Sequence, residues 1–332
     1  MSRAVTTQGR QSDTQTIRQP SASALLIDSM DRYADGYPSG PNNLISSSQW
    51  RLQSQGNVLN GYFTRLCLSQ IQFFWTLPTV IAGYNDQVNF TTYSATTPFP
   101  PLASYVATIP PGFYSVLSLL YATTTAMNTI VGTTVFTVPT TVDTGTGSYP
   151  LGNMVLIGNK AFTIDVPSVP ASRAGRFYQT SGLIPSANPD AATSTQVGGV
   201  PTLLPTRFID ITSSYLTKYQ RVKDASSLST GSTQNILGRV YAFAGNTSTP
   251  WPPSTQTPAT SAPFIPTYTW TTPEPFVVNQ DLATAKWLNW SPDEYGISGN
   301  FDITLLDEYG TLVPWDVSYG SEYQFTLLCS ES

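Results

Sequence analysis

The sequence predicts an all-β protein of the sandwich or jelly-roll type, and three observations support this. Charged residues make up only 11% of the 332 residues, whereas aromatic residues reach 12%. Thr, Val, Tyr and Phe, which favour strands, are plentiful, while the helix formers Glu, Lys and Met are scarce. Short runs of alternating polar and apolar residues are separated by Gly, Pro, Asn and Asp, as in folds built from many short strands.

Three segments show the alternation of a half-buried strand most clearly: Ser69–Trp75, Asn300–Leu305 and Glu322–Cys329. In each, every second residue is large and apolar while most of those between are polar. Eight further segments are predicted strands: Gln49–Gln53, Val88–Tyr93, Thr134–Val138, Ala161–Val166, Arg207–Ile211, Leu237–Phe243, Tyr268–Thr271 and Ala283–Trp290.

One helix is expected within the β framework. Apolar residues from Val116 to Ile130 keep helical spacing, although a run of Thr weakens the pattern. Ser115 is a suitable N-cap, and Gly132 is a suitable stop.

One segment precedes the predicted single domain of residues 23–332, and a second is a long loop within that domain. Residues 1–22 are polar and contain three cations, Arg3, Arg10 and Arg18, but only one acid, Asp13. This segment is either a solvated tail or an arm that orders against a neighbouring subunit, and three arginines are too few to indicate nucleic-acid wrapping. Residues 249–275 hold eight prolines, which predicts a long extended loop that is either a passive excursion or a subunit contact.

The residue types argue against an enzyme. The chain has no histidine, the side chain that most often serves as general acid or base and as a metal ligand. The acidic neighbours Asp293/Glu294 and Asp307/Glu308 do not form catalytic pairs, because adjacent residues on a strand point to opposite faces. No calcium-loop, Walker or dinucleotide glycine pattern occurs. We therefore expect no catalytic residue, no metal site and no cofactor.

The charges are unevenly distributed along the chain. Residues 1–240 carry 14 cations and 10 acids, whereas residues 241–332 carry one cation, Lys286, and 10 acids. This is either a solvated acidic surface or a surface that attracts the positive part of a neighbouring subunit. The low overall charge leaves a neutral surface that suits burial against partners.

The two cysteines carry one hypothesis. Cys67 and Cys329 both keep the inward parity predicted for their strands, Cys67 with Ile71 and Phe73, and Cys329 with Phe325. They are either two small buried apolar residues or a pair of thiols close enough to oxidise.

Several segments, in order along the chain, resemble the penton (minor capsid) proteins of virophages and polinton-like viruses. The opening Leu25–Arg32 with Tyr37-Pro38 is similar to an "IDS-x-DR…P" motif of that family. The other similar segments are Leu68–Pro78 with Tyr84–Val88, Ile109–Ser115, Arg207–Ser213 with Leu216–Gln220, and Asp302–Gly310 with its "DE-x-G" hairpin. Residues 133–205 and 245–298 have no clear counterpart, and Ile81 and Asp86 replace asparagines expected at the Asn-rich turn.

The resemblance implies a single jelly roll that forms homopentamers at five-fold vertices and contacts the major capsid protein, with no cofactor. Minor or cement proteins of the same virion are further candidate partners, and no specific nucleic acid is expected. The sequence also lacks an apolar signal segment and any run long enough to span a membrane. The expected location is therefore the virion, after synthesis inside the host cell.

Two alternatives remain open at this point. The chain could be a major capsid protein with two jelly rolls and a trimeric capsomer, although its length is short for that architecture. It could also be a glycan-binding or adhesion sandwich, with Trp251, Trp270, Trp287 and Trp290 as stacking surfaces or as packing residues.

Overall fold

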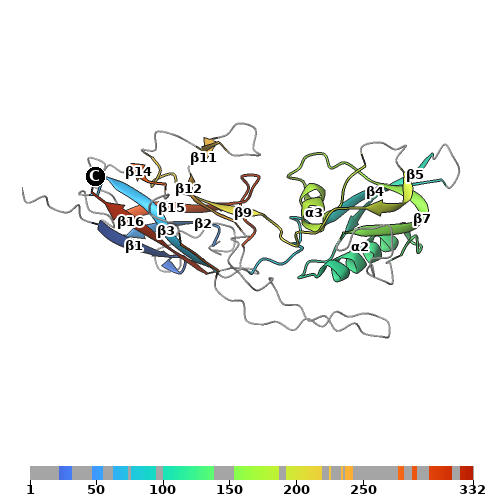
Figure 1. Cartoon of the computed structure of the whole chain (residues 1–332), viewed down its shortest axis with the longest axis horizontal. Coiled ribbons are helices and arrows are strands. Elements are labelled where there is room, and N and C mark those ends of the chain that lie inside the picture. The colour runs from blue at the N-terminus through green and yellow to red at the C-terminus, as the bar shows by residue number, and fades with distance from the viewer. Residues whose placement is uncertain are drawn as a thin grey trace, which may run out of the picture.

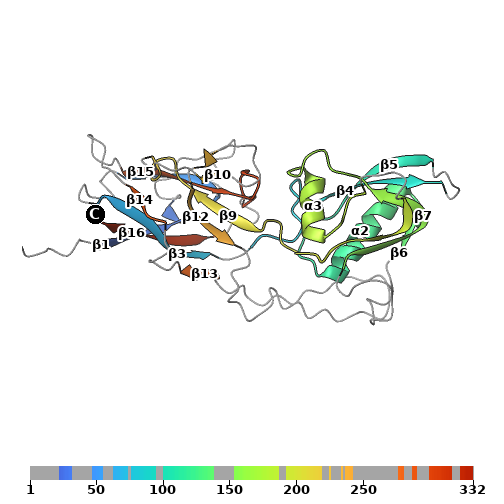
Figure 2. The same ribbon diagram turned by 45° about the horizontal axis from the view of Figure 1, so that its top comes forward.

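The fold is described from a computed structural model of the chain. It describes residues 22–31, 47–54, 63–73, 76–94, 100–137, 153–186, 192–218, 224–225, 233–234, 236–241, 276–279, 286–289, 299–315 and 322–331. These residues form two lobes that lie one after the other along the long axis of the molecule (Figures 1 and 2). We call them the jelly-roll lobe and the insertion lobe.

The jelly-roll lobe consists of two antiparallel sheets. The first has the order β1–β16–β3–β13, with β14 also paired to β3, and the second has the order β12–β9–β15–β2. The strands are β1 (Ala22–Asp28), β2 (Gln49–Ser54), β3 (Arg65–Phe73), β9 (Phe208–Thr212), β12 (Ile236–Tyr241), β13 (Phe276–Asn279), β14 (Leu288–Asn289), β15 (Gly299–Leu306) and β16 (Tyr323–Ser330). A small hairpin joins β10 (Asp224–Ala225) to β11 (Thr233–Gln234).

This strand order is that of a jelly roll. If β13 and β14 are counted as one broken strand, the roll has eight strands, and the first pairs with the last while the second pairs with the seventh. The two sheets enclose one apolar core that includes Trp50, Ile71, Ile211, Trp315 and Phe325. Trp50 crosses this core and donates its indole N–H to the hydroxyl of Tyr323, 2.5 Å away. The predicted all-β jelly-roll fold is therefore confirmed.

The insertion lobe occupies the connection between β3 and β9. Its sheet has the order β5–β4–β7–β6, and β8 pairs with the other edge of β7. The elements are β4 (Gln87–Tyr93), β5 (Pro101–Thr108), α2 (Val116–Val131), β6 (Phe136–Thr137), β7 (Val155–Ile164), α3 (Arg173–Ser181) and β8 (Thr193–Val197). Phe90, Phe136 and Phe162 meet edge to face in a second core, which both helices join.

The predicted helix is present with both of its predicted ends. Ser115 caps α2, because its side chain accepts a hydrogen bond from the Ser118 N–H, and Gly132 ends it at a φ of 76°. The second helix, α3, was not predicted. Its N-cap is Ser172 and it ends at Gly182, whose φ is 75°. A Cβ at Gly182 would lie 2.6 Å from the carbonyl oxygen of Gly199, so only glycine fits where the chain returns past this helix.

Most of the predicted strands match observed strands, with boundaries shifted by a few residues. Within the described parts of their predicted segments, β6 and β14 are shorter than predicted, and Tyr268–Thr271 lies outside the described residues. Strands β1, β5, β8, β10, β11 and β13 were not predicted. A single domain over residues 23–332 was predicted. The described residues have one large apolar cluster in each lobe and a small third cluster of Tyr93, Ala161 and Ala192. Residues 1–21 of the arm lie outside the described residues, as does the proline-rich loop 249–275. The last residue of the arm, Ala22, begins β1.

A β-bulge changes the predicted placement of the cysteines. The β3–β16 register shifts at Ser69, between the pairs Gln70↔Thr326 and Leu68↔Leu327. The shift reverses the alternation, so Leu66 and Leu68 face the core while Cys67 faces away from it. Cys329 pairs with Leu66 and joins the core, and both cysteines are buried and free. The two thiols therefore project from opposite faces of the sheet, not from one face as predicted.

Candidate functional site: the junction between the lobes

The tight turn after β15 places a carboxylate at the end of the jelly-roll lobe that faces the insertion lobe. The Oδ1 atom of Asp307 accepts the backbone N–H groups of Tyr309 and Thr311, each at 2.9 Å. Gly310 closes the turn at a φ of 75°, and its N–H donates to the Asp307 carbonyl. This arrangement is an Asx turn, and it leaves Oδ2 free to accept bonds from other elements.

Helix α3 presents a buried arginine to this carboxylate. Only 4% of the Arg176 side chain is exposed, and its Nη1 atom pairs with Asp307 Oδ2. Its Nη2 atom donates to Thr311 Oγ1 at 2.8 Å, and its Nε atom donates to the Ala171 carbonyl at 2.9 Å. A buried charge needs this degree of pairing, because an unpaired guanidinium would be very costly to remove from water.

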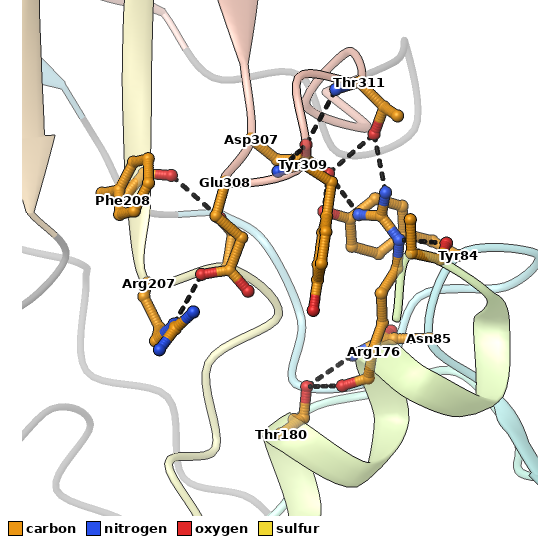
Figure 3. Close-up of polar contacts among 12 residues, drawn as sticks. Tyr84, Asn85, Arg176, Thr180, Arg207, Phe208, Asp307, Glu308, Tyr309 and Thr311 are labelled. Carbon is orange, nitrogen blue, oxygen red and sulfur yellow. Dashed lines mark hydrogen bonds and ion pairs between the residues drawn. The ribbon is translucent and has the colours of Figure 1, made fainter. Parts of the chain in front are cut away.

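Two tyrosines enclose the guanidinium group (Figure 3). Its central carbon lies 4.1 Å from the ring centroid of Tyr84 and 4.7 Å from that of Tyr309. Both distances are within the range of cation–π attraction. The Tyr84 hydroxyl also donates to Asp307 Oδ2 at 2.7 Å. We call Tyr84, Arg176, Asp307, Tyr309 and Thr311 the junction cluster.

The segment that leaves the jelly-roll lobe is bound to the same helix. Asn85, fully buried, accepts the Ile81 N–H and donates to the Thr79 carbonyl and to the Thr180 hydroxyl of α3. Asp86 forms a bidentate pair with Arg173 at 2.7 and 2.8 Å. The Asn-rich turn noted in the sequence thus connects the jelly-roll lobe to α3. Asp86, which stands where an asparagine was expected, has an arginine partner on that helix.

The returning segment is held in a similar way. The N–H groups of Thr202 and Leu203 both donate to the Thr180 carbonyl at 3.1 Å. Arg207 then pairs with the buried Glu308 at 2.6 Å, while 53% of its own side chain is exposed. Figure 3 shows Asp307 and Glu308 pointing to different arginines. The two adjacent carboxylates therefore serve two separate structural pairs. They do so from the turn after β15, which ends at Leu306, and not from the strand that the sequence predicted for them.

The ionisation of the cluster is governed by burial. Burial and the nearby Asp307 carboxylate raise the pKa of Tyr84 well above its ordinary value, with Arg176 opposing the shift. Burial, followed by Glu308, raises the pKa of Tyr309 to about 12. Both phenols are therefore neutral near neutral pH and are not poised for acid–base chemistry. The buried Tyr309 hydroxyl has no hydrogen-bond partner among the described residues.

The other residues considered from the sequence are distributed as follows. Arg3, Arg10, Arg18, Trp251, Trp270 and Trp290 lie outside the described residues, and Trp287 is 37% exposed. Within the described part of the chain, no group of three or more Cys, Asp or Glu residues is placed to hold a metal ion. Among the same residues, no helix has the length and apolar character needed to cross a membrane.

No protein-family model and no curated protein matches the chain. Among solved structures, it is similar to the crystal structure of the mavirus penton protein. The identity is 10% and the TM-score 0.47, and the match covers 95% of this chain and 100% of that one. A similarity of this size does not assign a fold, so the jelly roll is assigned from the strand order of this chain.

Proposed function

We propose that this chain is a structural protein of a viral capsid, and specifically a penton that forms homopentamers at five-fold vertices. One observation carries the proposal. Three segments that resemble penton proteins, and that are far apart in the sequence, meet at the lobe junction. They contribute Tyr84–Asp86, Arg207 and Asp307–Gly310.

The opening motif also has a structural role. The Ser29 hydroxyl donates to Glu322 at 2.7 Å and accepts the Tyr323 N–H at 2.9 Å. Asp28 accepts the Met30 N–H at 2.8 Å. The Ser29 bonds fasten the end of β1 to the start of β16, and the Asp28 bond closes the turn that follows β1. The residues that carry the resemblance thus maintain architecture, which supports a protein that works by its shape.

The proposed assembly requires a heterologous contact, because a five-fold ring joins two different faces of each subunit. Only some of the acidic residues in the C-terminal third are available for such a contact, because others already have partners within the same chain. Asp307 and Glu308 pair with arginines of the same chain, and Asp302 accepts the N–H groups of Ser214 and Tyr215. Electrostatic steering between subunits therefore rests on the remaining acids, and it predicts association that weakens with salt.

The arm of residues 1–22 and the major capsid protein complete the proposal. We infer that Arg3, Arg10 and Arg18 contact a neighbouring subunit, and that the assembled ring contacts the major capsid protein. Deletion of residues 1–21, which leaves β1 intact, is expected to weaken ring formation without unfolding the roll. Unchanged assembly of this variant would remove the arm from the proposal.

Light scattering of the purified full chain, combined with negative-stain images, tests the pentamer. One chain has a mass of 36.0 kDa, so five give about 180 kDa and a ring with five-fold symmetry. A mass of three chains would favour the trimeric capsomer. A stable monomer under all conditions would contradict both forms of assembly.

The alternatives have less support from the described residues. A major capsid protein would need a second jelly roll, but the insertion lobe has one sheet with α2 and α3 packed into its core. The glycan-binding alternative relied on four tryptophans, of which only Trp287 is described. Binding of the isolated chain to immobilised glycans would revive that alternative.

A further inference from the structure

The outer edge of the insertion lobe is formed by β5. This strand pairs with β4 on one side only, and it ends the sheet order β5–β4–β7–β6. Figures 1 and 2 show it at the end of the molecule farthest from the jelly-roll lobe. An edge strand presents a row of backbone donors and acceptors to whatever lies beside it.

The direction of these backbone groups follows from one hydrogen bond. The Ile109 N–H donates to the Asp86 carbonyl at 2.8 Å, next to the pair Gln87↔Thr108. In an antiparallel ladder the bonded pairs alternate, so Ala107 and Tyr105 also face β4. The N–H and C=O groups of Ser104, Val106 and Thr108 therefore point away from the sheet. No described residue pairs with this side of β5.

The side chains of the same three residues are exposed as well. Ser104, Val106 and Thr108 are all exposed, with 51% of Val106 accessible. Proteins usually protect such an edge with lysines, inward-pointing charges or a covering element. Here β5 has no charged residue, and none occurs anywhere between Asp86 and Asp143. Among the described residues, nothing covers this edge, and it is neutral and partly apolar.

The open stretch has defined ends. At its start, Leu102 is the extra residue of a bulge between the pairs Thr92↔Ala103 and Tyr93↔Pro101. At its end, Pro110 and Pro111 have no N–H to donate. The regular free edge is thus short and centred on Val106.

We propose that this edge pairs with the same edge of a second copy of the chain, antiparallel and around a two-fold axis at Val106. In that register Val106 lies opposite Val106, and Ser104 lies opposite Thr108. All three pairs are of the bonded type, so each exchanges two N–H···O bonds. Val–Val and Ser–Thr are favourable cross-strand pairs.

The neutral character of the edge explains why the occupant is a second copy. In a two-fold contact every residue meets its own surface, so any charge near the axis would face its like. The strand β5 lies in the longest stretch of the chain without a charged residue, so no charge on this strand meets its like across the axis. Strand addition across this edge would extend the sheet of the insertion lobe into that of its partner.

The experiment compares two variants of the full chain by light scattering across a wide dilution series. Val106→Lys places a charge at the proposed axis, where it would meet its own copy, and should weaken the two-fold association about tenfold or more. Ile130→Lys is the matched control, because Ile130 is an equally exposed apolar residue of the same lobe but lies on α2. It should leave the association unchanged. Equal effects of both variants, or no two-fold association of the unaltered chain, would overturn the proposal.

Hydrogen exchange provides a second readout that does not depend on a variant. The Ser104, Val106 and Thr108 amides should exchange quickly in dilute protein and slowly in concentrated protein, whereas Tyr105 and Ala107 should be protected in both. Fast exchange of all three amides at high concentration would contradict the pairing.

This contact is separate from the five-fold contact, and the masses distinguish them. Pentamers that associate in pairs, and that Val106→Lys returns to single pentamers, would support both proposals. Dimers that this variant splits would support only the β5 pairing. Pentamers that never associate would support only the capsid proposal.

Discussion

Replacement of Arg176 by Met is the sharpest test of the lobe junction. Methionine keeps much of the apolar stem but removes the guanidinium group from between Tyr84 and Tyr309. Asp307 would retain the Tyr84 and Thr311 hydroxyls and two backbone N–H groups, but it would lose its countercharge. Loss of one partner of a buried ion pair costs about 3–5 kcal/mol, a range that includes the cation–π contribution.

The expected effect is local to the junction, so the assay must resolve the two lobes. All seven tryptophans lie outside residues 76–250, and Trp50 and Trp315 lie in the jelly-roll core. Tryptophan fluorescence during urea unfolding therefore reports the jelly-roll lobe without a tryptophan signal from the insertion lobe. Hydrogen exchange at the Tyr309 and Thr311 amides, which donate to Asp307, should become faster by about a hundredfold or more.

Arg173→Met is the matched control for this prediction. Arg173 lies one turn earlier on α3 and pairs with Asp86, but 39% of its side chain is exposed. Asp86 itself is buried, so the loss of this pair costs more than the ~0–1 kcal/mol of a fully exposed pair, but Arg173 bonds to Asp86 and not to the Asp307 turn. If Arg176→Met and Arg173→Met changed exchange at Thr311 equally, the reasoning would be refuted. The double variant Arg176→Met/Asp307→Asn should recover part of the loss, because it removes the unpaired charge.

Three further predictions concern stability. Gly182→Ala should destabilise the chain by about 1–3 kcal/mol more than Gly132→Ala in thermal unfolding. Both glycines have a positive φ, but only at Gly182 would the new Cβ meet a backbone atom. Equal losses of stability in the two variants would contradict this. Burial raises the pKa of Cys329 to about 11 and that of Tyr178 to about 12. The stability that these neutral groups provide is therefore complete below their unfolded pKa values, and it is lost as the pH rises through about 11 and 12. Urea midpoints that stay constant as the pH is raised through these values would contradict the shifts. Val240→Ile should add a methylene to the small apolar cavity between the two sheets and stabilise the chain by about 0.8 kcal/mol in urea unfolding, whereas a loss of stability would mean that the cavity is too narrow.

Local signals allowed the sequence to predict part of the fold closely. The helix α2 was predicted with Ser115 and Gly132 at its ends, because capping depends on residues within one turn. The strand β15 was also predicted, because one of its faces lies on the core and its residues alternate accordingly.

The second helix was missed for a physical reason. Its buried face includes Ala174, Phe177 and Tyr178 at helical spacing, but it also carries Gly175 and the charged Arg176. Such a face does not have the apolar pattern of a helix. The cap residues Ser172 and Gly182 were the available signal, since they bracket a segment of helical length.

The junction itself was outside the reach of the sequence analysis. Arg176 and Asp307 are separated by 131 positions, and no local periodicity relates residues so far apart. Asp307 and Glu308 bond to different arginines, but they lie in the turn after β15 and not on a strand, and their partners could not be named from the sequence. The bulge at Ser69 likewise depends on pairing with β16, and it reversed the predicted direction of Cys67.

The way in which the insertion lobe is attached has a consequence for how the chain folds. The strands β3 and β9 belong to different sheets of the roll, and about 130 residues separate them in sequence. Both connecting segments bond to Thr180 of α3, so a folded insertion lobe brings its two ends together. Closing an unfolded loop of that length instead of a short one costs about 2 kcal/mol more in chain entropy. An insertion lobe that folds first would therefore let the jelly roll form as though β3 and β9 were joined by a short turn.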